Sequence, residues 1–183
     1  MFDLTTATIP KTPMDIYRSL PEGTRAEIID NVIYTPPSPF EVHQKISGVL
    51  SGEIYLYFKQ NNSQGRFYTA PFDVFLDEHT TSVQPDILIL LPENPVKIES
   101  RGHLHGVPDI VIELLSQGNK DYDLIRKKDL YERYGVREYF VVEPESGLTF
   151  HYYLQDGVYV LAKEEIRKLA SRLLNHVFEW YEW

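Results

Sequence analysis

The chain has 183 residues, with 18 Lys and Arg against 27 Asp and Glu, a formal net charge of −9 and no cysteine. This length predicts a single domain over residues 1–183, and 43% hydrophobic residues with 13% aromatics supply a packed core rather than a disordered chain. The missing cysteine excludes a disulfide scaffold, a thiolate metal site and a cysteine nucleophile, and the net charge argues against a protein that coats nucleic acid through bulk positive charge.

No targeting or membrane segment is visible in the sequence. The first ten residues lack the basic and apolar regions of a secretory signal, and no apolar run approaches the ~20 residues of a membrane helix. We therefore expect a cytoplasmic protein with no membrane partner, which also fits the absence of cysteine.

The N-terminal third predicts a short helix and a hairpin, followed by a long helix. The short helix is expected over 14–20, and the hairpin over 25–34 with Asp30-Asn31 as its turn. Ser38-Pro39-Phe40-Glu41 has the spacing of a capping box with proline at the first helical position. Apolar residues then recur at helical spacing, which predicts one helix over 39–60.

Apolar runs after residue 66 predict strands that are covered on both faces. The middle of the chain contains three of them, at 67–75 with a break at Pro71, 83–91 and 107–115. Between the last two, 91–107 is expected to be an irregular connection.

The last third predicts a second helix and further strands. The helix is expected over 121–134 and is stopped by Gly135, and a buried strand follows at 138–143. A hairpin is expected from 148–154 and 158–162, while the tail after residue 163 is ambiguous. The order of elements predicts an α/β or mixed α+β fold with a central mixed sheet.

Two strands of similar form carry the most informative acidic residues. The segments 84–89 and 107–113 each place Pro-Asp at the head of an apolar strand, and the second ends in Glu113. A carboxylate among apolar residues is costly unless it is paired, protonated or bound to a metal, although each acid also fits a strand end that leans into solvent. If the strands are neighbours, Asp86 and Glu113 converge, and Mg²⁺, with Mn²⁺ as the alternative, relieves their repulsion. Such a metal supports phosphodiester hydrolysis.

Phosphate chemistry also needs positive charge, and 116–139 is the least acidic part of the chain, with 6 Lys and Arg against 5 Asp and Glu. Asp123, Lys127 and Tyr131 are spaced four residues apart and share one helix face. The ordinary alternative is a solvated helix face. Candidate contacts to nucleic acid in this region are Lys120, Arg126 and Lys128.

These residues form an ordered series that resembles a known family. The series is Val83-Gln84-Pro85-Asp86, then Pro108-Asp109-Ile110-Val111-Ile112-Glu113-Leu114-Leu115-Ser116, then Asp123-x3-Lys127-x3-Tyr131-x3-Gly135-Val136-x-Glu138-Tyr139-x3-Glu143-Pro144. Together with the hairpin at 26–30 and the helix bearing His43, it is similar to the Uma-type family of restriction endonucleases in the PD-(D/E)xK nuclease superfamily. The resemblance covers about residues 14–162.

The resemblance implies a restriction-endonuclease-like core, with a central mixed sheet flanked by helices and additional β-hairpins. It implies DNA as substrate and Mg²⁺ held by Asp86 and Glu113, to which we add the Leu114 carbonyl. The superfamily's lysine lies two residues after the acidic ligand, where this chain has Leu115. The catalytic lysine is therefore expected from the following helix as Lys127, with Lys120 as the alternative. Asp123 or Tyr131 would hold the lysine in place.

Three residues outside this series complete the predicted site. Glu27 fits an upstream acidic position of the family, as a further ligand or as a group that positions water. His43 would face the site from the long helix, and Asp73 would line the same cleft. Their ordinary alternatives are a solvent-exposed hairpin carboxylate for Glu27 and a satisfied core histidine for His43.

Two rival functions remain open. His103 and His105 are spaced to share a metal on a strand, although flanking glycines favour a loop. Alternatively, the fold is a catalytically silent binding or assembly module, for which C-terminal aromatic residues such as Tyr152 and Trp180 would supply a dimer surface. The sequence leaves the oligomeric state open, and a homodimer is compatible with it because cutting two strands needs two sites.

Overall fold

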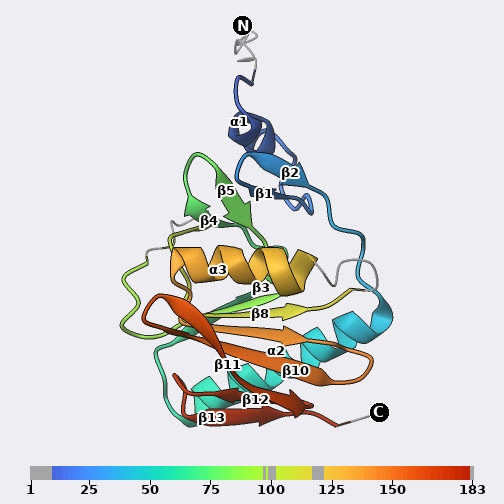
Figure 1. Ribbon diagram of the computed structural model, residues 1–183, viewed down its shortest axis with the longest axis vertical. Helices are drawn as coiled ribbons and strands as arrows, with labels where there is room; N and C mark the ends of the chain where they lie inside the picture. The colour runs from blue at the N-terminus through green and yellow to red at the C-terminus, as the bar shows by residue number, and fades with distance from the viewer. Residues whose placement is uncertain (1–9, 97, 99–101, 117–121, 182–183) are drawn as a thin grey trace, which may run out of the picture.

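The computed structural model describes residues 10–96, 98, 102–116 and 122–181, except for the side chains of residues 122–124. Over this part of the chain, two mixed sheets lie one above the other and a short two-stranded sheet lies near the C-terminus (Figure 1). The predicted mixed α+β class with a central mixed sheet is confirmed.

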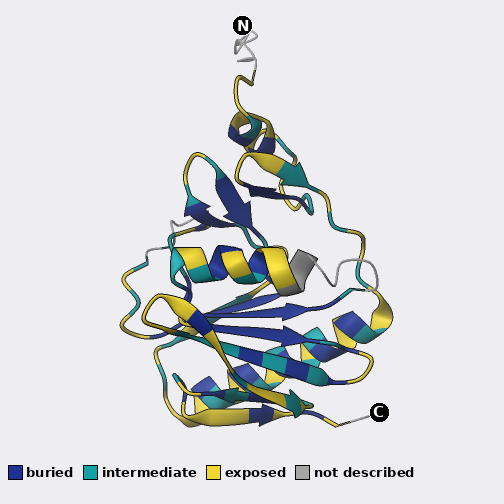
Figure 2. Ribbon diagram, viewed as in Figure 1, coloured by how far each residue is buried: buried dark blue, intermediate teal, exposed yellow. Residues whose placement is uncertain are grey.

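The larger sheet has the order β11-β10-β9-β8-β6-β3 within the described residues, and only β8 and β9 pair in parallel there. Its strands are β3 (Arg66–Thr69), β6 (Ile87–Leu90), β8 (Ile110–Leu114), β9 (Glu138–Val142), β10 (Leu148–Gln155) and β11 (Val158–Ile166). The central strands are buried along their whole length (Figure 2), which explains their continuous apolar sequence.

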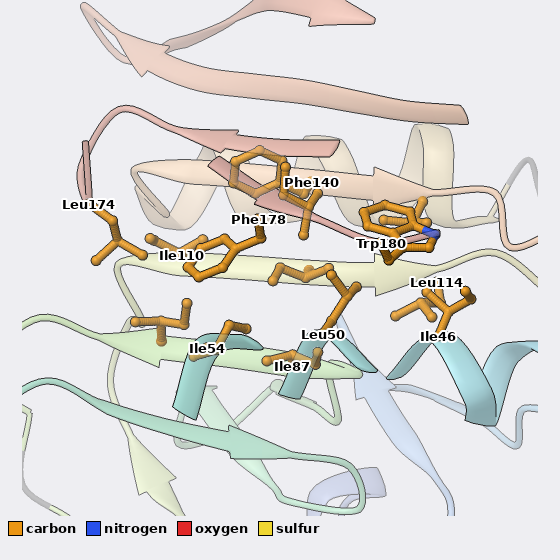
Figure 3. Packing of buried hydrophobic residues seen from close by; sticks show 14 of the residues in the cluster. Ile46, Leu50, Ile54, Ile87, Ile110, Leu114, Phe140, Leu174, Phe178 and Trp180 are labelled. Carbon is orange, nitrogen blue, oxygen red and sulfur yellow. The ribbon is translucent and has the colours of Figure 1, made fainter. Parts of the chain in front are cut away.

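Helices cover both faces of this sheet, and the strand alternation decides which residues each helix meets. Helix α2 (Glu41–Gln60) packs Leu50 and Ile54 against Ile87 and Ile110 on one face (Figure 3). On the other face, α3 (Lys128–Tyr134) packs with the residues that alternate with these, such as Val111.

The smaller sheet has the order β2-β1-β5-β4-β7 within the described residues, and α1 (Pro13–Arg18) packs against it. Its strands are β1 (Glu27–Ile29), β2 (Val32–Tyr34), β4 (Val74–Asp77), β5 (Thr81–Val83) and β7 (Leu104–His105). The hairpin turn at Asp30-Asn31 is confirmed, because both residues have the positive φ that a tight hairpin turn requires. A second such turn at Asp156-Gly157 joins β10 to β11.

Two apolar runs of the sequence, at 67–75 and 83–91, are each divided between the two sheets. The run at 67–75 becomes β3 and β4, and the run at 83–91 contributes to β5 and β6. The break at Pro71 was predicted, whereas the break at Gln84-Pro85-Asp86 was not. At both places the chain crosses from one sheet to the other, so strand pairing cannot continue.

The long helix begins later than its sequence suggests. Its N-cap is Phe40, which is extended and makes no side-chain capping bond, so the capping box predicted at Ser38 is wrong. The prolines at 36, 37 and 39 line a pocket together with Glu27 and Asp86. The segment before α2 is thus extended along that pocket instead of forming the first helical turn.

The later elements also differ in detail from the prediction. The second helix starts as a π-helix, η1 (Tyr122–Lys127), continues as α3 and ends as predicted at Gly135, which has φ 85°. The ambiguous tail forms β12 (Lys168–Ser171) and β13 (His176–Glu179). Its aromatic residues Phe178 and Trp180 are buried in the cluster below α2, which removes them from the proposed dimer surface.

Candidate functional site

Asp86 and Glu113 lie at the same end of two neighbouring strands. Strands β6 and β8 are antiparallel, with Ile87 opposite Ile112, so Asp86 just before Ile87 and Glu113 just after Ile112 are at one end of the pair. His43 of α2 contacts Asp86, whereas Tyr131 of α3 contacts Glu113 from the other side of the sheet. Both acids line one pocket, so they come together at the end of the strands.

Asp86 is held by the neighbouring strand and by α2. The Leu114 N–H donates to Asp86 Oδ2 over 2.8 Å, and His43 Nε2 lies 3.2 Å from the same oxygen. Within the described residues Asp86 is the hydrogen-bonding partner of the buried His43 ring, whose Nδ1 has none. His43 therefore faces the site, as the sequence predicts, and supports Asp86.

Glu113 forms a buried cluster with a lysine from η1 and an acid from the smaller sheet. Lys127 Nζ lies 2.8 Å from Glu113 Oε1 and 2.9 Å from Glu27 Oε1, and all three side chains are at least 94% buried. The two sheets thus meet at this ammonium group. Glu27 is not the exposed hairpin carboxylate of the ordinary interpretation.

Tyr131 contributes a neutral hydrogen-bond donor to this cluster. Its hydroxyl donates to Glu113 Oε1 over 2.7 Å from a fully buried position on α3. Burial, reinforced by the charge of Glu113, raises the pKa of Tyr131 well above 10, so the phenol stays protonated. Tyr131 thus holds Glu113, which is one of the two acids that contact Lys127.

The clustered residues line one pocket, with a cavity of about 50 Å³, which we call the carboxylate pocket. That volume holds a few water molecules, since one water needs roughly 10–15 Å³ by the same measure. The pocket walls carry three carboxylates, Glu27, Asp86 and Glu113, against two cationic groups, Arg25 and Lys127. Formal negative charge is therefore in excess at this point, which favours a cation.

The donor set fits Mg²⁺ but not a metal held by protein side chains alone. Among the described residues, no group of three His, Cys, Asp or Glu side chains is arranged to hold a metal. Mg²⁺ keeps several of its waters and is usually bound by one or two carboxylates. Asp86 and Glu113, with Leu114 also lining the pocket, match that requirement.

Asp73 lies one step away from the pocket. Its Oδ1 accepts bonds of 2.7 Å from Gln84 Nε2 and of 2.7 Å from the Tyr17 hydroxyl. The Gln84 backbone N–H in turn donates to Glu27 Oε1 over 2.8 Å. Asp73 therefore reaches the cluster through Gln84 and does not line the carboxylate pocket itself.

The predicted nucleic-acid contacts are not gathered at the pocket. Arg126 lies against the Tyr34 ring, and Lys128 lies 5.6 Å from the centre of the Tyr152 ring. Neither residue lines the carboxylate pocket. Lys120 and the side chain of Asp123 lie outside the described residues.

The two histidines of the rival metal site are paired with different acids. His103 Nδ1 lies 3.1 Å from Asp73 Oδ2, and His105 Nδ1 lies 2.5 Å from Glu78 Oε1. A histidine-based metal site needs a third side-chain ligand, and the described residues hold no such group of three. The rival therefore gains no support from this arrangement.

Sequence reasoning missed Gln84 and Arg25 as members of the site. Gln84 stands inside the Val83-Gln84-Pro85-Asp86 motif, so its position beside the acid was available as a signal. Arg25 precedes Glu27 by two residues and therefore projects from the same side of the chain. Both residues line the carboxylate pocket.

The fold and the pocket define a nuclease-like protein, in which a mixed sheet places two acids beside a lysine from a following helix. The same fold occurs in a solved structure from Anabaena variabilis, titled "putative nuclease belonging to DUF820", with a TM-score of 0.66 and 21% identity over 85% of this chain and 83% of that chain. The Uma2 family model, described as "Putative restriction endonuclease", matches residues 14–178. The chain belongs to this family, and the match extends beyond the predicted limit at residue 162.

Two further findings concern relatives of the chain and membrane-spanning helices. No curated protein matches it. Among the described residues, every helix is too short or too polar to span a bilayer.

Proposed function

We propose that the protein is a metal-dependent endonuclease that hydrolyses phosphodiester bonds in DNA. The observation that carries this proposal is the meeting of Asp86, Glu113 and Lys127 in one pocket, although they come from the segment before β6, from β8 and from η1. Family membership supports the same reaction class.

Asp86 and Glu113 would hold Mg²⁺, with the Leu114 carbonyl as a further oxygen ligand. When bound, the ion would polarise a phosphate oxygen and lower the pKa of a coordinated water. The excess of negative charge on the pocket walls favours this binding. Mn²⁺ would serve as a substitute because it accepts the same oxygen ligands.

The protein's own groups would position the reactants and stabilise charge. Lys127 places an ammonium at the pocket wall, where it would stabilise negative charge that develops on the phosphate in the transition state. Glu27 also contacts this ammonium and would orient the attacking water. Tyr131 and His43 keep the two acidic ligands in place.

Cleavage and metal binding are measured separately to test the proposal. Supercoiled plasmid and labelled single-stranded DNA are incubated with Mg²⁺, with Mn²⁺ or with EDTA, and Mn²⁺ binding is followed by calorimetry. We expect metal-dependent cleavage that Asp86→Asn, Glu113→Gln and Lys127→Met each abolish. Equal cleavage by wild type and these variants would refute the site, whereas metal binding without cleavage by wild type would support the silent binding module instead.

A homodimer is the assembly that we propose for cutting both strands of a duplex. Each pocket holds one set of acids and one lysine, so two strands require two pockets. Sedimentation velocity with and without duplex DNA measures this directly, and a monomer that nevertheless cuts both strands at once would contradict it.

A further inference from the structure

A second cavity lies next to the carboxylate pocket. It lies between α2 and the end of β3 and has a volume of about 480 Å³. We call it the α2–β3 groove. It shares Arg25, His43 and Asp86 with the carboxylate pocket, so the two cavities are adjacent.

The lining of the α2–β3 groove mixes polar and apolar residues and is mostly uncharged. Its walls include Gln44, Ser47 and Ser51 from α2 and Thr69 from β3. Hydroxyl and amide groups of this kind hydrogen-bond to phosphate and sugar oxygens. Asp86, at the junction with the carboxylate pocket, is the acidic residue among the described groove-lining side chains.

Arg25 lies at the junction of the two cavities and has no partner in the described chain. It is half-buried, and no hydrogen bond or ion pair joins it to a described residue. A partly desolvated guanidinium is costly unless it meets an anion, and its planar fork matches two phosphate oxygens. Its position therefore favours a phosphate group of a ligand that extends from one cavity into the other.

The formal charges at the site also favour a phosphate group as the ligand. The pocket walls carry one more formal negative charge than positive charge when Arg25 and Lys127 are set against the three carboxylates. A bound divalent cation would turn this into a single positive charge. A phosphodiester carries one negative charge, so it would complete the balance.

We infer that Arg25 binds a backbone phosphate next to the scissile bond and that the α2–β3 groove holds one nucleic-acid strand leaving the reaction site. This inference rests on the proposed endonuclease function and names where its substrate lies. The groove volume falls within the roughly 300–1,000 Å³ of small-ligand pockets, which suits a strand with its bases unpaired rather than a duplex.

Two glycines on α2 provide a matched test of the groove. A Cβ added at Gly48 or at Gly52 meets no atom within 4 Å, so both positions have room for a side chain to start outward from the helix. Gly48 lines the groove and Gly52, one turn further on, does not. Gly48→Phe should therefore block the groove, while Gly52→Phe serves as its control.

Binding is measured by fluorescence anisotropy with a labelled single-stranded DNA 12-mer, in Ca²⁺ to prevent turnover. We expect Gly48→Phe to weaken binding at least tenfold and Gly52→Phe to bind as wild type does. Circular dichroism and thermal melting check folding. Should Gly48→Phe fail to fold, Gln44→Trp would block the groove from an exposed position. Equal binding by the blocked variant and its control would overturn the groove assignment.

Arg25→Gln tests the phosphate contact. Lys59→Gln is the control, because it removes one positive charge at a different place, on α2. We expect Arg25→Gln to weaken binding about tenfold and to lower the slope of log affinity against log salt by about 0.7, the value for one phosphate contact on a single strand. Arg25→Lys should recover part of the affinity. Affinity and slope equal to those of Lys59→Gln would overturn the assignment.

The outcomes separate this inference from the proposed function. Arg25-dependent binding by a wild-type protein that never cleaves would refute the endonuclease and leave the strand site standing. Normal cleavage with Arg25-independent binding would refute only the strand site. Stronger binding of a duplex than of the single strand would also overturn the inference.

Discussion

Lys127 Nζ lies 2.8 Å from Glu113 Oε1, although the two residues are 14 positions apart and belong to a helix and a strand. The position on the strand that would carry a lysine in the superfamily's common pattern is Leu115. The ammonium group instead reaches Glu113 from the last residue of η1, across the face of the sheet that α3 covers.

Replacing Lys127 should separate stability from metal binding. Lys127→Met leaves Glu27 and Glu113 buried beside each other, and breaking a buried ion pair in this way costs about 3–5 kcal/mol. We expect a lower unfolding free energy in urea and at least ~100-fold slower cleavage, because transition-state charge is no longer stabilised. Calorimetry should show Mn²⁺ affinity at or above that of wild type. A large loss of Mn²⁺ affinity would show instead that Lys127 is needed to keep the metal site intact.

Removing either acidic ligand should abolish metal binding. Asp86→Asn and Glu113→Gln keep the side-chain size but remove the charge that holds a divalent cation. We expect Mn²⁺ affinity to fall by more than ~100-fold, and the rise in melting temperature that excess Mg²⁺ gives wild type to disappear. Asp129→Asn, which alters an exposed acid on α3, is the control. Wild-type affinity in either ligand variant would show that the ion binds elsewhere.

Tyr131→Phe should weaken catalysis without removing a ligand. The substitution deletes only the hydroxyl that donates to Glu113, and loss of a group that orients a metal ligand typically costs ~10–100-fold in metal affinity or activity. Steady-state cleavage kinetics should show the loss in kcat with KM little changed. An unchanged kcat would assign Tyr131 a packing role.

The same variant should change stability in alkali. The pKa of Tyr131 is raised by folding, so its contribution to stability is complete below about pH 10 and is lost as the pH rises toward the folded-state value. Urea unfolding of Tyr131→Phe between pH 8 and pH 11 should therefore depend less steeply on pH than that of wild type. Equal slopes would contradict the buried neutral phenol.

Glu138 should control stability in acid rather than activity. Burial by itself raises its pKa, but the His151 ring 3.5 Å away and hydrogen bonds from Ser171 and the Arg172 backbone outweigh burial and hold the pKa below its usual 4.5. Its stabilising contribution is thus present above about pH 4.5 and is lost as the pH falls below that value. In Glu138→Gln, the unfolding free energy measured with urea should fall less steeply as the pH drops below 4.5, while cleavage at neutral pH persists. If it falls as steeply in the variant as in wild type, another carboxylate is responsible.

Local sequence patterns predicted the elements well where neighbouring residues decide the backbone. The turns at Asp30-Asn31 and Asp156-Gly157 and the helix stop at Gly135 depend on residues that tolerate positive φ, so a few adjacent letters suffice. The prediction of a capping box at Ser38 was wrong because that segment lies along the pocket wall. This is a long-range contact that the local sequence does not reveal.

The sequence by itself determined that Asp86 and Glu113 stand in apolar strands and that the chain resembles a nuclease family. The tertiary structure decided that the strands are antiparallel neighbours, which brings these acids to one pocket. It also placed Lys127 in contact with both Glu27 and Glu113 and left Arg25 at the mouth of a groove. The physical reason is that backbone preference is a local property, whereas a site is built from side chains that only the packing of distant segments brings together.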